Sequence, residues 1–315
     1  MRAVVQDAYG IAGVLRVDEV PEPEPAEGEV VVRVRAAGVD QGVRHLVTGE
    51  PGVVRVATGL RRPRNRVPGA DLAGVVERVG VGVRGFDVGD EVFGVGRGAF
   101  AELACALADR IVRKPASLTF AQAAVLPVSG ITALQAVRGR VGERVLVLGA
   151  SGGVGAYAVQ LAKALGARVT GVCSGAKAEF VRSLGADEVV DHREAEPTGR
   201  YDLVVDTGGR RPLRVLRRLL TPRGALVVVG GEGGGAWFGG LQRQLGALLL
   251  NPLVRHSLTC PVSLVGADDL HRLVDFVERG QLRVPLDRAY PLDRAEDALL
   301  RLSGGRVLGK VAVTV

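Results

Sequence analysis

Residues 144–155 read Arg-Val-Leu-Val-Leu-Gly-Ala-Ser-Gly-Gly-Val-Gly, an apolar run that ends in clustered glycines. Residues 156–165 continue with the apolar spacing of a helix. A buried parallel strand that passes into a helix in this way brings main-chain N–H groups at the helix N-terminus close to an anion. A side chain at Gly152 or Gly155 would fill the space that a pyrophosphate or the packed helix needs. The stretch therefore predicts a phosphate-binding turn.

Alternating strand and helix patterns follow this turn. Because glycine is abundant, at 45 of 315 residues, the glycine cluster alone could mark a merely Gly-rich α/β turn. Alternating β and α units with short connections, however, predict a right-handed parallel sheet, and a glycine loop after its first strand is the dinucleotide fingerprint. We therefore predict an α/β, doubly wound Rossmann sheet, with further strands at 167–172, 188–191, 202–206 and 225–229 and helices at 178–184 and 213–220.

Bulk composition limits the class of protein. A chain of 315 residues with 47% apolar residues can form two globular domains, each with its own core. The longest apolar candidate for a membrane span, residues 241–253, is interrupted by Gln, Arg and Asn, and the N-terminus lacks a signal-peptide core. The three cysteines are far apart and have no metal or redox spacing. We expect a soluble protein of the reducing cytoplasm, without a transmembrane segment.

The net charge of +7 raises the question of a nucleic-acid partner. Arginines are scattered and aromatic residues make up only 4%, too few for base-stacking platforms, so we expect no nucleic-acid binding. The one dense basic run, residues 61–66, is typical of a solvated loop. The alternative for this run is a surface that attracts anionic ligands or acidic lipid.

Residues 1–118 have mostly strand patterns. Short strand-like segments within residues 29–39, 67–80 and 86–94 are broken by glycine turns, and the proline-rich segment 21–28 is a stiff extended connector. This spacing predicts a compact, partly closed β-barrel.

Several motifs occur in one order along the chain: Ala-Ala-Gly-Val at 36–39, Pro-Gly-Ala-Asp-Leu-Ala-Gly-Val-Val at 68–76, Val-Gly-Asp-Glu-Val-Phe-Gly at 88–94, Gly-Ala-Phe-Ala-Glu at 98–102, Leu-Pro-Val-Ser-Gly-Ile-Thr-Ala at 126–133, and the glycine loop. Over residues 1–315 this order resembles the medium-chain dehydrogenase/reductase superfamily. The likeness is greatest to the zinc-free quinone oxidoreductases, and within them to the reticulon-interacting and chloroplast-envelope quinone-oxidoreductase-like group.

The resemblance implies a GroES-like β-barrel domain, made from both ends of the chain, around an inserted Rossmann domain. We expect the GroES-like part at residues 1–118 and 260–315 and the Rossmann domain at 119–259. Dimers are common in the family, which implies a homodimer here.

A metal site is not expected. Zinc-dependent members of the superfamily place a Cys after the Gly-Val pair, a His after Pro-Gly and a Cys shortly before the Rossmann domain. The matching positions hold Asp40, Ala70 and, approximately, Val125. Ala and Val cannot bind a metal, and one carboxylate falls short of the three protein ligands of a catalytic zinc. The four-cysteine structural lobe between Phe93 and Phe100 is also missing, so oxidation of simple alcohols is disfavoured.

The end of the second strand of the predicted Rossmann sheet bears on cofactor choice. NAD-preferring sites usually carry an acidic residue there, whereas residues 172–177 read Val-Cys-Ser-Gly-Ala-Lys. Ser174 can donate a hydrogen bond and Lys177 supplies a positive charge, although Lys177 could also be a solvated helix residue. In the resembled quinone reductases the corresponding Ser and Lys bind the 2′-phosphate, and His192 matches a position near the adenosine, so NADPH is the implied cofactor.

The resemblance implies the remaining cofactor contacts. Thr132 would lie near the nicotinamide, Thr207 and Gly230 would border the ribose and nicotinamide at the strand ends, and Lys310 belongs to a Gly-Lys-x-Val run that returns towards the cofactor. The pyrophosphate would be held by Ser151, Gly152, Gly153, Val154 and Gly155.

The implied reaction is hydride transfer from NADPH to a quinone or an α,β-unsaturated carbonyl. Asp40, our candidate catalytic residue, stands where the family commonly has Asn. It could orient a ribose hydroxyl, act as a proton donor if burial keeps it neutral, or be structural. His45 falls near a proton-relay position of the zinc enzymes and could be a structural or ribose-side contact.

The segment 231–260 is the expected source of substrate choice. Flexible glycines at 233–235 precede Trp237 and Phe238, which suits a loop over the nicotinamide, so these two aromatics and His45 form the predicted substrate pocket. Residues 241–250 have amphipathic helix character. This helix could be a core or dimer-interface helix, or it could contact a membrane surface where lipophilic quinones reside.

Two rival functions stay open. One is an NAD(P)-dependent dehydrogenase or reductase of a pathway-specific ketone or alcohol. The other, from a different class, is a non-catalytic NADPH-binding protein.

Overall fold

The computed structural model describes residues 1–230, 235, 237–261 and 265–315, and the chain groups into two compact units. Unit 1 consists of Met1–Ile131, Leu264–Glu278 and Val284–Val315, so both ends of the chain build it. Unit 2 consists of Thr132–Ser263 and Arg279–Arg283. The domain boundaries that the sequence suggests, after residues 118 and 259, stay predictions.

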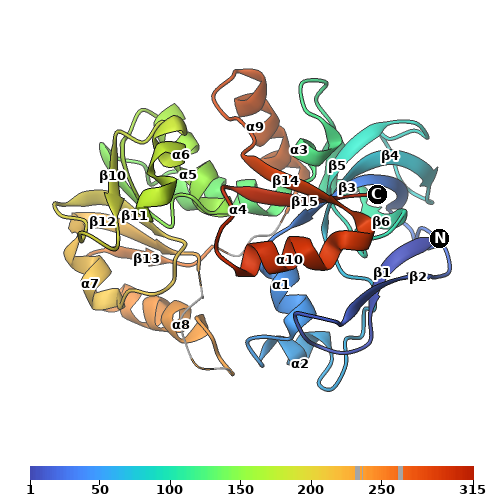
Figure 1. The fold of residues 1–315 in the computed structure, drawn as a ribbon. Coiled ribbons are helices and arrows are strands. Elements are labelled where there is room, and N and C mark those ends of the chain that lie inside the picture. The colour runs from blue at the N-terminus through green and yellow to red at the C-terminus, as the bar shows by residue number, and fades with distance from the viewer. Residues whose placement is uncertain (231–234, 236, 262–264) are drawn as a thin grey trace. The chain divides into compact units, whose positions relative to one another are not determined.

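Unit 2 contains a parallel sheet (Figure 1). The order of the six strands is β10-β9-β8-β11-β12-β13, with β8 at Arg144–Leu148, β9 at Arg168–Cys173, β10 at Glu188–Asp191, β11 at Tyr201–Asp206, β12 at Leu220–Val228 and β13 at Ser257–Thr259. The chain winds outward from β8 to β10 and then returns to β11 on the other side of β8. The predicted doubly wound sheet is confirmed, and its switch point, where such sheets bind ligands, lies between β8 and β11.

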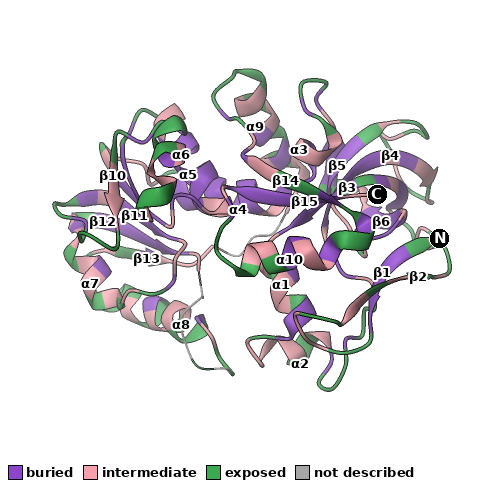
Figure 2. Cartoon of the chain, in the orientation of Figure 1, coloured by how far each residue is buried: buried purple, intermediate pink, exposed green. Residues whose placement is uncertain are grey.

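Helices flank this sheet. They are α5 at Gly153–Ala164, α6 at Ala178–Ser183, α7 at Leu213–Arg218 and α8 at Leu241–Leu250, with single 3₁₀ turns η2 at Gly175–Lys177 and η3 at Asn251–Leu253. The apolar runs of β8 and β11 are buried, as strands covered on both faces should be (Figure 2). Leu146, Leu148 and Val204 pack in one apolar core with residues of β12 and β13.

Unit 1 is built on a seven-stranded, mostly antiparallel sheet of order β14-β15-β3-β4-β5-β7, in which β6 also pairs with β3. The strands are β3 at Glu29–Val39, β4 at Asp71–Val79, β5 at Glu91–Val95, β6 at Leu103–Leu107, β7 at Ile111–Arg113, β14 at Leu286–Pro291 and β15 at Lys310–Thr314. A two-stranded ribbon, β1 at Arg2–Gln6 and β2 at Leu15–Glu19, completes the unit. Long β3 is the centre of the sheet, because β4, β6 and β15 all pair with it.

Short helices border the sheet of unit 1: α1 at Gln41–Thr48, α2 at Val54–Thr58, α3 at Phe120–Ala123, α9 at Ala267–Glu278 and α10 at Ala295–Ser303, with 3₁₀ turns η1 at Ala108–Arg110 and η4 at Leu292–Arg294. Helix α4, Pro127–Val137, begins in unit 1 and ends in unit 2. The basic run 61–66 forms no regular element, and Arg61, Arg62 and Arg64 are exposed, as expected of a solvated loop.

Candidate functional site

The turn between β8 and α5 is shaped by two glycines that no other residue could replace without strain. Gly149 has a φ of +77°, and a Cβ there would lie 2.4 Å from Thr207 Oγ1. A Cβ on Gly155 would lie 2.1 Å from the carbonyl oxygen of Gly149, so only glycine lets α5 approach β8 this closely. The prediction that this glycine serves helix packing is therefore supported by geometry.

Gly152 plays a different part in the same turn. A Cβ at this position would meet only the Gly149 oxygen, at 3.4 Å, and the residue is the N-cap of α5 with no side-chain cap bond. The first turn of α5 carries no acidic residue. The first N–H groups of a helix have no acceptor within it and attract anions. Gly152 thus leaves room for a phosphate in front of those N–H groups, beside Ser151, Gly153 and Val154.

The carboxyl ends of β8, β11 and β12 meet at this turn. Thr207, directly after β11, donates its hydroxyl hydrogen to the Leu148 oxygen at 2.7 Å. Gly230, after β12, donates its N–H to the Asp206 oxygen at 3.0 Å, and a Cβ on Gly230 would lie 2.1 Å from the Thr207 oxygen. The structure therefore brings the predicted cofactor residues Thr207 and Gly230 to the glycine turn.

The end of β9 holds the predicted 2′-phosphate residues. Ser174 and Lys177 lie on one turn, where the Lys177 N–H bonds the Ser174 oxygen at 2.8 Å, and His192 Nδ1 lies 2.8 Å from the Cys173 oxygen. Lys177 has further interactions of its own. The three residues predicted for the adenosine end thus occupy the ends of neighbouring strands β9 and β10.

A carboxylate that sequence reasoning missed lies among them. Asp191 Oδ2 accepts the Gly175 N–H at 2.7 Å, and its Oδ1 accepts the Arg193 N–H at 2.9 Å. These bonds, first that of Arg193, hold the pKa of Asp191 below its ordinary value despite some desolvation. Residues 172–177 contain no carboxylate, as the sequence indicates, but the last residue of the neighbouring strand β10 supplies one beside them. Only the parallel register of Asp191 with Cys173 reveals it.

Unit 1 contains a group of buried polar residues that strand register assembles. Val311 of β15 pairs with Val39 of β3, which places Lys310 next to Asp40. Ala37 of β3 pairs with Leu72 of β4, which places Asp71 next to Gly38. Lys310 donates to Ser129 Oγ at 2.9 Å and lies 3.9 Å from Asp40 Oδ2. We call Asp40, Asp71, Ser129 and Lys310 the buried charge cluster.

The carboxyl groups of this cluster differ in exposure and in bonding. The side chain of Asp40 is 13% exposed, and its Oδ1 accepts the Val43 N–H at 2.9 Å as the N-cap of α1. Asp71 is 1% exposed, with Oδ1 accepting the Val128 N–H at 3.2 Å, and its Oδ2 is buried without a partner in the described part of the chain. Asp40 is therefore the carboxyl through which the cluster reaches solvent.

Burial and, to a lesser degree, the negative charge of Asp40 raise the pKa of Asp71 to about 8, against the opposing effects of Lys310 and the Val128 N–H. Asp71 is consequently a neutral acid at pH 7. Lys310 is 2% exposed and lies inside unit 1, not at its surface. A lysine beside a terminal strand would ordinarily be solvated, and its sequence neighbours gave no sign of these partners.

Other predicted residues lie apart from these groups. Thr132 is buried on α4. His45 is on α1, where its Nδ1 contacts the backbone oxygen of Glu50, a contact that fits a structural role. Trp237 and Phe238 are 70% and 55% exposed, and the preceding glycines at 231, 233 and 234 lie outside the described residues. The assignment of His45, Trp237 and Phe238 to a substrate pocket stays a prediction.

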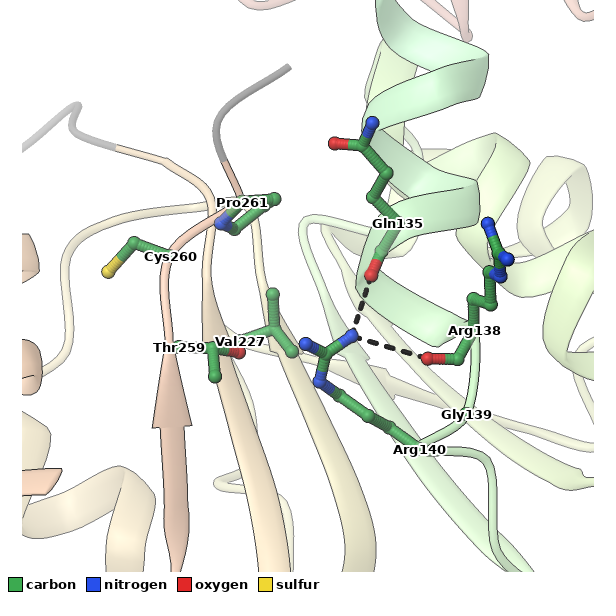
Figure 3. Close-up of a pocket in the computed structure, with 8 residues that line it drawn as sticks. All are labelled: Gln135, Arg138, Gly139, Arg140, Val227, Thr259, Cys260 and Pro261. Carbon is green, nitrogen blue, oxygen red and sulfur yellow. Dashed lines mark hydrogen bonds between the residues drawn. The ribbon is translucent and has the colours of Figure 1, made fainter. Parts of the chain in front are cut away.

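A cavity of about 430 Å³ in unit 2, which the sequence did not reveal, lies beside the second half of α4 (Figure 3). Its lining combines the end of α4 and the following turn with β12 and the end of β13: Gln135, Arg138, Gly139, Arg140, Val227, Thr259, Cys260 and Pro261. Arg140 Nη1 donates to the backbone oxygens of Gln135 at 2.8 Å and Arg138 at 3.3 Å. Burial raises the pKa of the Cys260 thiol. Gln135 lies about one helical turn after Thr132 on α4, but Thr132 does not line the cavity.

Within the described residues, no three His, Cys, Asp or Glu side chains come together as metal ligands. The same part of the chain has no helix that is long and apolar enough to cross a membrane.

The chain is similar to known proteins over its whole length. A family model described as "Zinc-binding dehydrogenase" matches residues 184–313, and the "Alcohol dehydrogenase GroES-like domain" model matches residues 26–116. The chloroplast envelope quinone oxidoreductase homolog of Arabidopsis thaliana is 34% identical, over 99% of this chain and 98% of its own length. The mitochondrial NAD(P)H oxidoreductase RTN4IP1 of Bos taurus is 30% identical, over 100% of this chain and 89% of its own length.

Solved structures agree with these relatives. The quinone oxidoreductase from Coxiella burnetii has a TM-score of 0.85 at 27% identity, covering 100% of this chain and 99% of that one. The Escherichia coli quinone oxidoreductase complexed with NADPH has a TM-score of 0.83 at 25% identity, with full coverage of both chains. The predicted fold, a GroES-like β domain with a Rossmann domain, is confirmed.

Proposed function

The chain belongs to the quinone oxidoreductases of the medium-chain dehydrogenase/reductase superfamily, and on this premise we propose that it is a zinc-independent reductase that uses NADPH to reduce quinones or α,β-unsaturated carbonyls. The observation that carries the proposal is the contrast between Gly155 and Gly152 in the β8–α5 turn. The first glycine is needed for packing, whereas the second leaves a space that the protein itself does not fill. A pyrophosphate has the size and charge for that space.

Main-chain N–H groups of Gly153 and Val154 would bind the pyrophosphate, with Ser151, Gly152 and Gly155 forming the rest of the turn. Lys177, Ser174 and His192 would bind the 2′-phosphate. Because Asp191 already accepts two backbone N–H groups, its charge is partly satisfied and its presence is compatible with a phosphate nearby. Thr132, Thr207, Gly230 and Lys310 complete the proposed cofactor residues.

When bound, NADPH supplies the hydride, and the chain must position the acceptor and handle a proton. The cavity at the end of α4 has the volume of a small-molecule site, but none of the predicted cofactor or substrate residues lines it. Asp40, the partly exposed and negatively charged carboxyl of the buried charge cluster, would orient a ribose hydroxyl, and Lys310 would hold it in position. The proton that the reduced acceptor needs would come from water. Without a metal ion, delocalised acceptors are favoured over simple ketones.

A homodimer and a cytoplasmic location belong to the same proposal. Among the described strands, β13 lies at the edge of its sheet, and a sheet edge is a surface that a second copy can extend. The three free cysteines fit a reducing compartment. Analytical ultracentrifugation and cell fractionation test these two points.

The function is tested by following NADPH and NADH oxidation with a panel of quinones and enones, using protein dialysed against a chelator. We expect turnover with NADPH that the chelator does not change, and no oxidation of simple alcohols. Activity restored only by added zinc would contradict the proposal. NADPH binding without turnover across the panel would favour the non-catalytic alternative.

A further inference from the structure

The cavity at the end of α4 has no part in the proposed function. Its volume of about 430 Å³ is that of a small-molecule site, and every residue that lines it belongs to unit 2. Protein interiors are close-packed, with few voids larger than a water molecule. A hollow of this size that the proposed cofactor and substrate residues leave unused is a candidate site for a separate ligand.

One face of the parallel sheet forms the floor of the cavity. Val227 of β12 pairs with Thr259 of β13, so their side chains project from the same face. The next residue, Cys260, turns to the opposite face, where its Sγ lies 3.6 Å from the Gln244 oxygen of α8. Figure 3 shows this sulfur directed away from Arg140. The chemistry of the cavity therefore depends on the face that carries Val227 and Thr259, and not on the thiol.

Arg140 faces this floor from the turn after α4. Its Nη1 donates to the backbone oxygens of Gln135 at 2.8 Å and Arg138 at 3.3 Å. Carbonyl groups at the end of a helix have no partner within it, so these bonds cap α4 and fix the guanidinium there. Figure 3 shows the guanidinium between the end of α4 and the side chains of Val227 and Thr259, whereas the Arg138 side chain points away.

The other donors of Arg140 have no acceptor in the described part of the chain. Only Nη1 is engaged, and no Asp or Glu is among the residues that line the cavity. Nε and Nη2 lie on one edge of the planar guanidinium, where their N–H groups are parallel. This edge matches the two oxygens of a carboxylate.

Thr259 offers a further donor on the floor. Its Oγ1 is buried and has no hydrogen-bond partner within the described residues. A buried hydroxyl without a partner costs about 1–3 kcal/mol. Figure 3 shows the hydroxyl on the side of Thr259 that faces Arg140. The remaining lining includes the apolar side chains of Val227 and Pro261. The cavity thus combines one cation that lacks a counter-charge and one hydroxyl that lacks a partner with an apolar surface.

These features select the class of ligand. One guanidinium matches the single negative charge of a carboxylate, whereas a phosphate dianion needs a second cation, and Arg138 points away. A neutral ligand would leave the charge of Arg140 without a partner.

We propose that the cavity binds a small organic carboxylate. Its oxygens accept hydrogen bonds from Nε and Nη2 of Arg140 and from the Thr259 hydroxyl, and its apolar part lies against Val227 and Pro261. The binding requires neither NADPH nor an acceptor, so the proposal does not depend on the proposed function.

Calorimetry with 2-naphthoate as the probe tests the ligand class, using the full-length protein without nucleotide. We expect a Kd below about 1 mM. The amide of the same shape, 2-naphthamide, should bind at least tenfold more weakly because it lacks the charge. Equal affinities for the acid and the amide would overturn the proposal. Tighter binding of inorganic phosphate than of 2-naphthoate would overturn it as well.

Variants test the contacts. Arg140→Gln should weaken 2-naphthoate binding at least tenfold, and Arg140→Lys, which keeps the charge but not the paired N–H groups, at least fivefold. Thr259→Val keeps the shape and should weaken binding about threefold without lowering the thermal unfolding temperature, because the hydroxyl has no partner to lose. Arg138→Gln removes the same charge two residues away and is the matched control, with an expected change below twofold. Equal losses for Arg138→Gln and Arg140→Gln would contradict the proposed contact.

A crystal structure with 4-iodobenzoate locates the site independently of any variant. The anomalous signal of iodine should lie in the cavity, with the carboxylate on Arg140. A signal found only elsewhere would overturn the proposal. Saturating NADPH should change the affinity for 2-naphthoate less than twofold, and displacement by NADPH would assign the carboxylate to the cofactor site instead. If the protein fails to bind NADPH, the proposed function fails, whereas the measurements made without nucleotide still decide this proposal.

Discussion

The two units place charge at their candidate sites by different means. In unit 2, the positive potential at the β8–α5 turn comes from main-chain N–H groups, and the side chains at Gly149, Gly152 and Gly155 are absent so that a ligand or a helix can approach. In unit 1, the buried charge cluster consists of ionisable side chains with little access to water. The first arrangement can be read from a local motif. The second depends on the register of three strands.

This difference has an energetic consequence. A main-chain anion site costs the empty protein little, because its N–H groups can bind water. A buried cluster with two carboxyl groups and one lysine needs every member, since a lost partner leaves an uncompensated charge. Substitutions in the buried charge cluster should therefore lower stability, whereas a substitution that fills the space at Gly152 should weaken nucleotide binding.

The largest effect is expected for Lys310→Met. Removal of this buried cation leaves the carboxylate of Asp40 without its counter-charge and Ser129 without its hydrogen-bond donor. It should lower the free energy of unfolding by about 3–5 kcal/mol, measured by denaturant titration. Lys114→Met is the matched control. The Lys114 side chain is 6% exposed, but its partner Glu91 is 52% exposed and screened by water. This control should lose about 1–2 kcal/mol. Equal losses would contradict the role given to the cluster.

In unit 2, Gly155→Ala and Gly152→Ala should separate packing from binding. The first substitution places a Cβ 2.1 Å from a backbone oxygen, which should cost about 1–3 kcal/mol of stability. At Gly152 the φ of −83° suits alanine and the nearest atom is 3.4 Å away, so stability should change by less than about 0.5 kcal/mol. NADPH affinity of this variant should still fall at least tenfold, as calorimetry would show. The reverse pattern would remove the argument for a phosphate in this space.

The pH dependence of stability tests the electrostatics of the cluster. The folded-state pKa of Asp71, about 8, lies above its ordinary value of 3.8. The stability that protonated Asp71 contributes is therefore complete below about pH 4 and is lost as the pH rises through 8. One proton allows a slope of at most about 1.4 kcal/mol per pH unit.

Asp71→Asn keeps the shape of the neutral carboxyl group. It should remove this loss of stability with rising pH when unfolding free energies are compared between pH 5 and 8.5. The control is Asp90→Asn. The pKa of Asp90 is lowered, first by its bond from the Asp87 N–H, so its stabilising effect is lost only in acid. If the two variants have the same profile above pH 5, Asp71 is not the buried acid described here.

The smallest effect concerns cofactor choice. Lys177→Ala should weaken NADPH binding about tenfold, or about 1.4 kcal/mol, and change NADH binding less than twofold, because only NADPH carries the 2′-phosphate. Lys163→Ala is the control in the same unit, since the Lys163 Nζ lies 2.9 Å from Asp187 Oδ1. Fluorescence titration with both nucleotides measures these affinities. Equal losses for NADPH and NADH would leave Lys177 without a role in phosphate recognition.

Sequence patterns predicted the glycine turn of unit 2 better than the buried charge cluster of unit 1, because the two sites are assembled differently. The strand, the glycines and the helix of the turn are adjacent in the chain, so spacing alone predicts their geometry. Asp71 and Lys310 meet only because β4 and β15 both pair with β3, and no local pattern contains that information. Asp191 was missed in the same way, since it reaches the end of β9 from the neighbouring strand. The α8 helix was predicted, but its exposed apolar side became evident only once burial of Ala247 fixed its orientation.

The central claim is that the β8–α5 turn seats NADPH through main-chain N–H groups. A crystal structure of the protein grown with NADPH tests it most directly. We expect the pyrophosphate in front of Gly152, within hydrogen-bond distance of the Gly153 and Val154 N–H groups, and the 2′-phosphate beside Ser174 and Lys177. A nucleotide bound elsewhere in the protein, with the turn filled only by water, would contradict the account.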